Sequence, residues 1–159
     1  MKLLDPKILL AAALLGATLA TGAAPLARAV TSDSTPEADL PDSYKDAKEM
    51  VEDEEYNEAI PLLEKSIQEK GGDFADALNM LGYSYRKLGD MPKALDYYTR
   101  ALALEPKHLG ANEYMGELYL EMKDLPHAEE RLAVLKAACG DCDEMEDLEK
   151  AIKKYKKNS

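Results

Sequence analysis

Small and apolar residues recur at fixed offsets through the middle of this chain. The first copy of the pattern comprises Leu78, Leu81, Gly82, Tyr85, Ala94, Tyr98, Ala101 and Pro106. Shifted by 34 positions, the same offsets hold Asn112, Met115, Gly116, Tyr119, Ala128, Leu132, Leu135 and Gly140. The turn recurs as well, with Asp90 and Pro92 in one copy and Asp124 and Pro126 in the next. Because the apolar residues follow at helical spacing, the pattern predicts pairs of helices joined by short turns.

A weaker copy of the pattern precedes these two. It is expected from Tyr44 to Lys70, and its register is held by Ala47, Met50, Ala59, Leu63 and Ser66. Ala59 lies 35 residues before Ala94, one more than the repeat length. The additional residue can be accommodated at the glycines 71 and 72, which follow the second helix. We therefore expect three repeats within residues 44–140, at about 40–74, 75–108 and 109–142.

A last apolar stripe predicts a seventh helix over residues 143–157. Its members are Met145, Leu148, Ile152 and Tyr155. A helix pair standing alone would leave an apolar face in water, so the pairs should stack and this helix should cap the last of them. Gly82 and Gly116 are small where the two helices of one pair should cross. Three tyrosines are expected to fill the space between layers, namely Tyr85, Tyr98 and Tyr119.

The N-terminal segment has the pattern of an export signal. Lys2 and Lys7 precede an apolar stretch, and Ala27 to Ala29 provide the small residues of a signal-peptidase site. We expect a signal peptide over residues 1–29 with cleavage after Ala29, a flexible linker over residues 30–43, and a periplasmic or secreted bacterial protein without membrane insertion after cleavage. Retention of the segment as a membrane anchor is the alternative.

The charge balance narrows the range of partners. The chain carries a formal net charge of −11, which repels nucleic acid and anionic lipid. The one dense basic run, at residues 150–157, shares a helix with Glu146, Asp147 and Glu149. Basic residues are expected in the last turn of a helix because they complement its dipole. Protein or peptide is thus the expected partner, and nucleic acid is not.

The repeated residues resemble the tetratricopeptide repeat (TPR) family over about residues 40–140. The resemblance implies an all-α, right-handed α-solenoid of about three helix-turn-helix pairs with a C-terminal capping helix. It also implies a concave groove, lined by the first helix of each pair, that binds extended peptides or helices. The family's clamp for a C-terminal carboxylate is missing, because its positions fall at Tyr44, Lys48, Met80, Gly110 and Tyr114.

Carried over position by position, the resemblance selects a set of groove residues. These are Tyr44, Lys48, Val51, Asp76, Asn79, Tyr83, Arg86, Lys87, Glu113, Glu117, Leu120 and Glu121. Tyr83 is expected to act as an aromatic anchor for the partner, with Arg86 and Lys87 setting the polarity of the groove. A ligand with both a basic and an acidic portion would suit this set.

Two cysteines, Cys139 and Cys142, stand between the last repeat and the capping helix. In an oxidising compartment they are expected to pair, either as a structural disulfide or as a redox-active dithiol. His108 and His127 each stand alone, so no metal site or cofactor is expected. We also find no catalytic motif in the sequence.

The sequence therefore favours a non-catalytic protein-protein interaction module of the bacterial cell envelope. Two alternatives remain. One is a thiol-disulfide exchange protein that uses Cys139 and Cys142, and the other is a scaffold that self-associates as a homo-oligomer.

Overall fold

A computed structural model of the chain describes residues 39–159, which fold into seven helices without a strand. The helices are α1 (Asp42–Glu52), α2 (Tyr56–Glu69), α3 (Ala75–Lys87), α4 (Met91–Leu104), α5 (Leu109–Glu121), α6 (Leu125–Ala138) and α7 (Asp143–Asn158). The expected signal peptide, its cleavage site and residues 30–38 of the expected linker lie outside the described residues. Helix α1 begins at Asp42, so the end of the expected linker is helical, and Ser43 is buried there. None of the helices in residues 39–159 is long and apolar enough to span a membrane.

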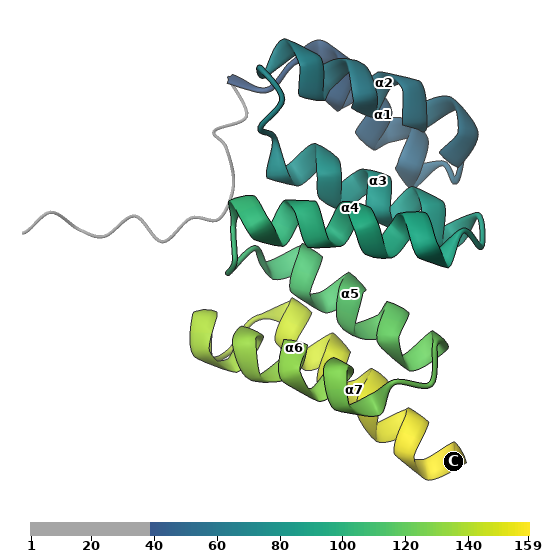
Figure 1. Ribbon diagram of the computed structural model, residues 1–159, viewed down its shortest axis with the longest axis vertical. Coiled ribbons are helices and arrows are strands. Elements are labelled where there is room, and N and C mark those ends of the chain that lie inside the picture. Colours follow the sequence, from purple (N-terminus) through teal and green to yellow (C-terminus); the bar gives the residue numbers. More distant parts are fainter. Residues whose placement is uncertain (1–38) are drawn as a thin grey trace, which may run out of the picture. The chain divides into compact units, whose positions relative to one another are not determined.

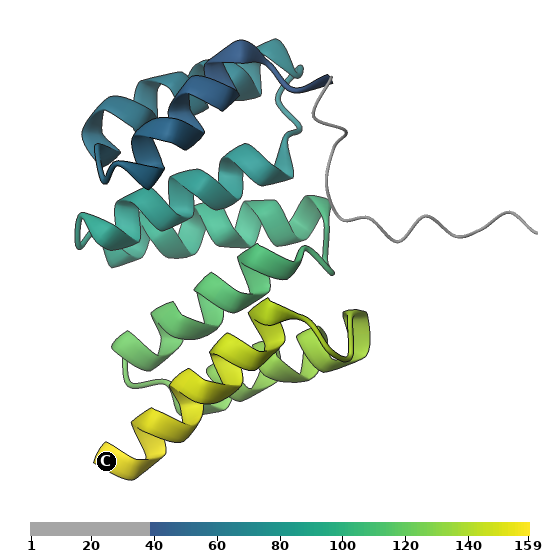
Figure 2. The ribbon, with the colours of Figure 1, turned by 180° about the vertical axis from the view of Figure 1, so that it is seen from behind.

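The helices stack as successive pairs, α1 with α2, α3 with α4, and α5 with α6. In Figure 1 the second helix of each pair lies nearer the viewer, and Figure 2 shows the opposite side with α1, α3, α5 and α7 in front. Helices α3, α5 and α7 begin at Ala75, Leu109 and Asp143, which are 34 residues apart. Helix α7 thus occupies the place of the first helix of a fourth pair. The predicted fold class, an all-α helical repeat solenoid, is confirmed.

The turns follow the chemistry of the repeated sequence. Asp90 accepts a hydrogen bond from the backbone N–H of Lys93 (3.2 Å), and Asp124 accepts one from His127 (3.3 Å), so both aspartates cap the following helix. A proline stands in the first turn of both α4 and α6. The extra residue of the first repeat lies after α2, where Gly71 (φ 79°) and Gly72 (φ 104°) adopt left-handed conformations, as the register predicted.

Two glycines allow close approach between helices, at different kinds of interface. A Cβ atom on Gly82 would stand 2.6 Å from the ring of Tyr98, which is fully buried in α4 of the same pair, as expected. At Gly116 the nearest atoms belong to Leu148 of α7 (2.5 Å), so the expected crossing within the pair is wrong for this glycine. The physical reason is that α7 packs on α5 as a further first helix would. Tyr98 is core as expected, whereas Tyr85 and Tyr119 are only half-buried.

Alanine at Gly82 should be worse tolerated than alanine at Gly116. Both substitutions raise the helix propensity by a similar amount, so the difference between the stabilities of the two variants reports the steric contact. The Tyr98 ring is rigid and enclosed, whereas the methyl groups of Leu148 end a side chain that can rotate. Urea unfolding should show Gly82→Ala less stable than Gly116→Ala by about 1–2 kcal/mol, within the range for overpacked cores. Equal stabilities would contradict the close packing of α3 on α4.

Candidate partner-binding face

Helices α1, α3 and α5, which lie in front in Figure 2, line a hollow together with Glu54 of the following turn and Tyr56, the first residue of α2. Its volume is about 350 Å³. We call it the tyrosine hollow, and its lining residues are Lys48, Val51, Glu52, Glu54, Tyr56, Met80, Tyr83 and Tyr114. The first helices of three successive pairs thus contribute to one site, because the repeat places them side by side.

Three tyrosine rings give this hollow its chemistry. The ring centroid of Tyr83 lies 4.9 Å from that of Tyr114 and 6.2 Å from that of Tyr56. Burial, with a contribution from nearby Glu113, raises the pKa of Tyr114 to about 12, so its phenol stays neutral. Lys87 lies over the Tyr83 ring at 5.6 Å. The hollow therefore offers an aromatic surface with charges of both signs around it, namely Lys48, Glu52, Glu54 and Lys87. Its aromatic part suits an apolar or aromatic side chain.

Arg86 does not set the polarity of the groove as expected. Its side chain is only 8% exposed, and its guanidinium donates to Glu117 (2.7 Å) and Glu121 (3.1 Å) of α5. It also lies 5.6 Å from the Tyr83 ring and 5.9 Å from the Tyr114 ring. The charge of Arg86 is thus neutralised within the chain, because the next repeat places two glutamates opposite it. Its role is to hold α3, α5 and the two rings together.

Five other residues expected in the groove are buried. These are Tyr44, Val51, Asn79, Glu113 and Leu120, of which Val51 still lines the tyrosine hollow. Tyr44 packs on Phe74 with 4.8 Å between ring centroids, and burial raises its pKa well above the usual range. Leu120 belongs to the apolar core shared by α5, α6 and α7. These side chains are largely withdrawn from solvent, so the structure corrects their placement on open surface.

The remaining expected groove residues differ in their accessibility. Lys48, Lys87 and Glu121 are exposed, whereas Tyr83, Glu117 and Asp76 are partly buried. Asp76 accepts a hydrogen bond from Nε2 of His108 (3.1 Å). Nδ1 of the same ring accepts from the backbone N–H of Ala111, so the pair caps α5. Asp76 is therefore engaged in the fold.

The expected groove set lacks five residues of the hollow, namely Glu52, Glu54, Tyr56, Met80 and Tyr114. Met80 and Tyr114 are 34 residues apart and hold the same place in their repeats. They stand three residues before Tyr83 and Glu117, so they share the face of those residues. That spacing identifies both residues as members of this face, although neither is a residue type of the carboxylate clamp.

Carboxylates dominate the α5 end of this face. Glu113 is 9% exposed, and burial, together with Glu117, Glu144 and Asp147, raises its pKa to about 8, against the opposing effect of Arg86. Within residues 39–159, no three His, Cys, Asp or Glu side chains converge closely enough to hold a metal ion. This end of the face thus favours positive charge and lacks the geometry of a metal centre.

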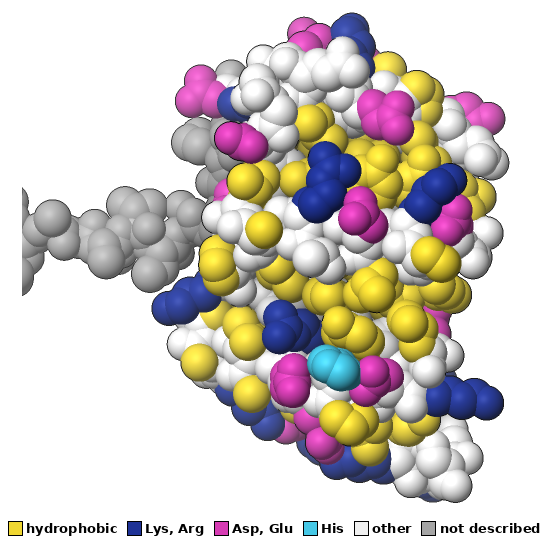
Figure 3. Space-filling view, in the orientation of Figure 1, with side chains coloured by type: hydrophobic (Ala, Val, Ile, Leu, Met, Phe, Trp, Pro, Cys, Tyr) yellow, Lys and Arg dark blue, Asp and Glu magenta, His cyan; other side chains and the backbone are white. Residues whose placement is uncertain are grey.

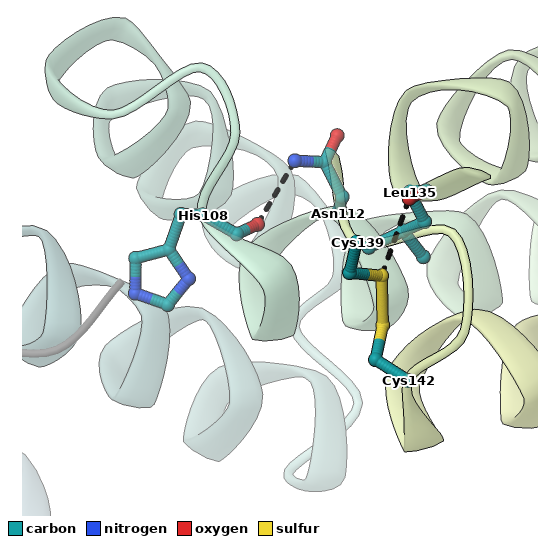
Figure 4. The surroundings of a disulfide bond; sticks show 5 residues. All are labelled: His108, Asn112, Leu135, Cys139 and Cys142. Atoms are coloured by element: carbon teal, nitrogen blue, oxygen red, sulfur yellow. Dashed lines mark hydrogen bonds between the residues drawn. A yellow bond between two sulfur atoms is a disulfide. The ribbon is translucent and has the colours of Figure 1, made fainter. Parts of the chain in front are cut away.

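A disulfide joins the end of α6 to the start of α7 (Figure 4). The sulfur atoms of Cys139 and Cys142 are 2.07 Å apart, and the Cys139 sulfur lies 3.2 Å from the carbonyl oxygen of Leu135. Gly140 adopts φ 70° in the short turn between them. Neither cysteine lines the tyrosine hollow. Both predicted roles of the cysteine pair, as a structural disulfide and as a redox-active dithiol, stay predictions.

The opposite side of the stack, drawn in Figure 3, mixes apolar side chains with charges of both signs. On α3 and α4, Tyr85 and Tyr97 stack with 5.4 Å between ring centroids and 3° between ring planes. Lys93 lies over Tyr85 at 4.6 Å, and Arg100 lies over Tyr97 at 5.1 Å. This aromatic pair is covered by cations of its own chain.

Known proteins share the repeat and the fold. The family model described as tetratricopeptide repeat matches residues 75–108. A 67-residue stretch is 37% identical to Protein KINESIN LIGHT CHAIN-RELATED 3 from Arabidopsis thaliana, and the match covers 37% of this chain and 10% of that relative. The chain thus spans a small part of the length of this relative.

Two solved structures have a similar fold. A tetratricopeptide repeat protein from Parabacteroides merdae superposes with a TM-score of 0.61 at 18% identity, over 73% of this chain and 45% of that one. PcrH, crystallised in complex with the chaperone binding region of PopB, gives a TM-score of 0.60 at 18% identity, over 77% of this chain and 98% of its own. The 34-residue register, the stacked helix pairs and these matches agree that residues 75–108 are a tetratricopeptide repeat and that the described chain has the fold of tetratricopeptide repeat proteins.

Proposed function

We propose that this protein is a non-catalytic interaction module that holds a peptide or helix of a partner protein against α1, α3 and α5. The tyrosine hollow carries the proposal, because it joins three repeats into one aromatic site. Buried aromatic anchors supply most of the affinity in many protein interfaces. A helix that docks in a groove does so through apolar anchors spaced along one of its faces.

The similar structure of PcrH supports a role in binding protein segments. That protein was crystallised with the chaperone binding region of PopB. At 18% identity the likeness concerns the fold, so the identity of the partner here has to come from experiment. The hollow itself indicates that the partner contributes an apolar or aromatic side chain.

We place the module in the bacterial cell envelope. The support is the export pattern of residues 1–29 and a cysteine pair suited to an oxidising compartment. Cell fractionation followed by N-terminal sequencing tests this part separately, and the expected mature N-terminus is Val30. A cytosolic protein that begins at Met1 would contradict it.

Site-specific photo-crosslinking in the native cell tests the partner-binding face. A photoreactive residue at Tyr83 should attach one discrete partner, whereas the same residue at Thr99, exposed on α4, should attach none. With the partner identified, Tyr83→Ala should weaken its binding by about 2 kcal/mol, roughly 30-fold, as for an aromatic anchor. Tyr83→Phe retains the ring and should bind within about threefold of wild type. Equal crosslinking at both positions, or unaltered affinity of Tyr83→Ala, would refute the assignment of this face.

A further inference from the structure

The repeat brings two carboxylates together between α5 and α7. One interface earlier, Asn79 of α3 lies against Gly110 of α5, with the amide nitrogen 3.1 Å from the place of a Cβ on that glycine. Shifted by 34 residues, the same two positions hold Glu113 and Glu144. Leu148 packs directly on Gly116 between these helices, so α7 approaches α5 closely beside the two glutamates. A neutral contact in one interface is thus replaced by two acids in the next.

Further carboxylates surround Glu113. Glu117 follows it by one turn on α5, and Asp147 stands near it on α7. We call Glu113, Glu117, Glu144 and Asp147 the acidic basin. Two of its members already have a cation, since Arg86 binds Glu117 as well as Glu121, and Lys150 forms an exposed pair with Asp147 (3.0 Å). Within residues 39–159, Glu113 and Glu144 are the members of the basin that form no ion pair.

Glu113 is the side chain that indicates a ligand. It is nine-tenths buried, and it makes no hydrogen bond or ion pair with any residue of the described part of the chain. Buried carboxyl groups in proteins are normally hydrogen-bonded or paired, because leaving them unpaired costs free energy. Its pKa of about 8, raised first by burial and then by the neighbouring acids, makes it mostly neutral at pH 7. A cation placed in the basin would restore its ionised form.

We infer that the acidic basin binds a lysine or arginine side chain of the partner whose apolar side chain occupies the tyrosine hollow. The two sites adjoin, because Tyr114 lines the hollow and Glu113 precedes it on α5, while Arg86 contacts Tyr83, Tyr114 and Glu117. The inference rests on the proposed function and names the chemistry of the partner. An ammonium or guanidinium group suits the basin better than a metal ion, since no three described acidic, histidine or cysteine side chains converge as metal ligands.

A small cationic probe tests the basin without the partner. N-acetyl-arginine amide and its neutral analogue N-acetyl-citrulline amide are titrated into the full chain, with the Glu113 carboxyl followed by carbon NMR. The arginine probe should lower the pH at which Glu113 ionises by about one unit, and the citrulline probe should leave it unchanged. Affinity for the arginine probe should rise from pH 6 to pH 8, because binding requires the ionised carboxylate of Glu113 among Glu117, Glu144, Asp147 and Arg86.

Substitutions locate the binding. Glu113→Gln, which keeps the shape of the side chain, should weaken binding of the arginine probe about tenfold. Glu144→Gln changes a partly exposed carboxylate and should also weaken binding of the arginine probe. This second variant tests the basin even if Glu113→Gln affects folding. Glu130→Gln, exposed on α6, is the matched control and should bind as wild type does. Equal effects of both probes, or wild-type affinity in Glu113→Gln and Glu144→Gln, would overturn the inference.

The two proposals fail separately. If the arginine probe binds the basin but no partner is crosslinked at Tyr83, the tyrosine hollow loses its assignment and the cation site remains. If a partner is captured at Tyr83 while the probes do not differ, the module stands and the basin is not its basic-side-chain site.

Discussion

Replacing Arg86 by methionine is expected to lower the free energy of unfolding by about 3 kcal/mol, although the residue stands on the proposed binding face. Its guanidinium holds Glu117 and Glu121 of the next repeat and packs near two tyrosine rings. Without it, the carboxylates of Glu117 and Glu121 would repel one another. The loss should fall at the lower end of the range for buried pairs, because Glu117 (29% exposed) and Glu121 (44% exposed) can still reach water.

Urea unfolding with a matched control measures this contribution. Lys87→Met changes the neighbouring cation, which is exposed, and should alter stability by less than about 0.5 kcal/mol. Adding Glu117→Gln and Glu121→Gln to Arg86→Met should restore part of the lost stability, because the unpaired charges are removed. If Arg86→Met is as stable as Lys87→Met, Arg86 does not join the repeats, and the earlier expectation that it serves the ligand would be favoured.

Truncating Leu148 to alanine should cost about 3 kcal/mol and loosen mainly the C-terminal end of the stack. Leu148 is fully buried and lies on Gly116 of α5, within the core formed with Leu120, Leu135 and Ile152. Repeat proteins are stabilised by contacts between neighbouring units, so the cavity weakens the attachment of the last helix directly. Gly116 has no side chain that could rotate into the cavity left by Leu148→Ala.

Hydrogen exchange and denaturant unfolding together test the capping role of α7. In Leu148→Ala, amide protection should fall in α5, α6 and α7 while α1 and α2 keep theirs. Lys154→Ala alters an exposed residue of the same helix and serves as the control, with an expected change below about 0.5 kcal/mol. Uniform loss of protection through all seven helices of residues 39–159 would show a single cooperative unit and refute the local effect.

The repeat in the sequence predicted the helices well because each one is encoded locally. Asp90 and Asp124 supply caps, the apolar spacing marks the buried side of each helix, and the paired glycines at 71 and 72 mark the extra residue. These signals act within a few residues of one another, so they can be read without knowledge of the packing. The expected start of the first pair at Tyr44 was off by two residues because Asp42 and Ser43 have no apolar periodicity.

The binding face was predicted only in part. The repeat identified its side of the stack and the central Tyr83, but it could not show which residues there remain open. Arg86 and Leu120 hold the same position in successive repeats, and both are buried, one in an ion pair and the other in an apolar core. Their environments depend on which side chains the next helix presents, and that information lies a full repeat away in the chain.

The sequence by itself determined the number of helices after residue 39, their order, their caps and their assignment to a stacked repeat, since all of these follow from local spacing. The tertiary structure decided the contacts between repeats. It joined Arg86 to two glutamates of α5, placed Leu148 on Gly116 and enclosed Glu113 among acids of α5 and α7. A helix pattern specifies which face is buried, whereas the partner of each buried group is fixed only when neighbouring helices meet.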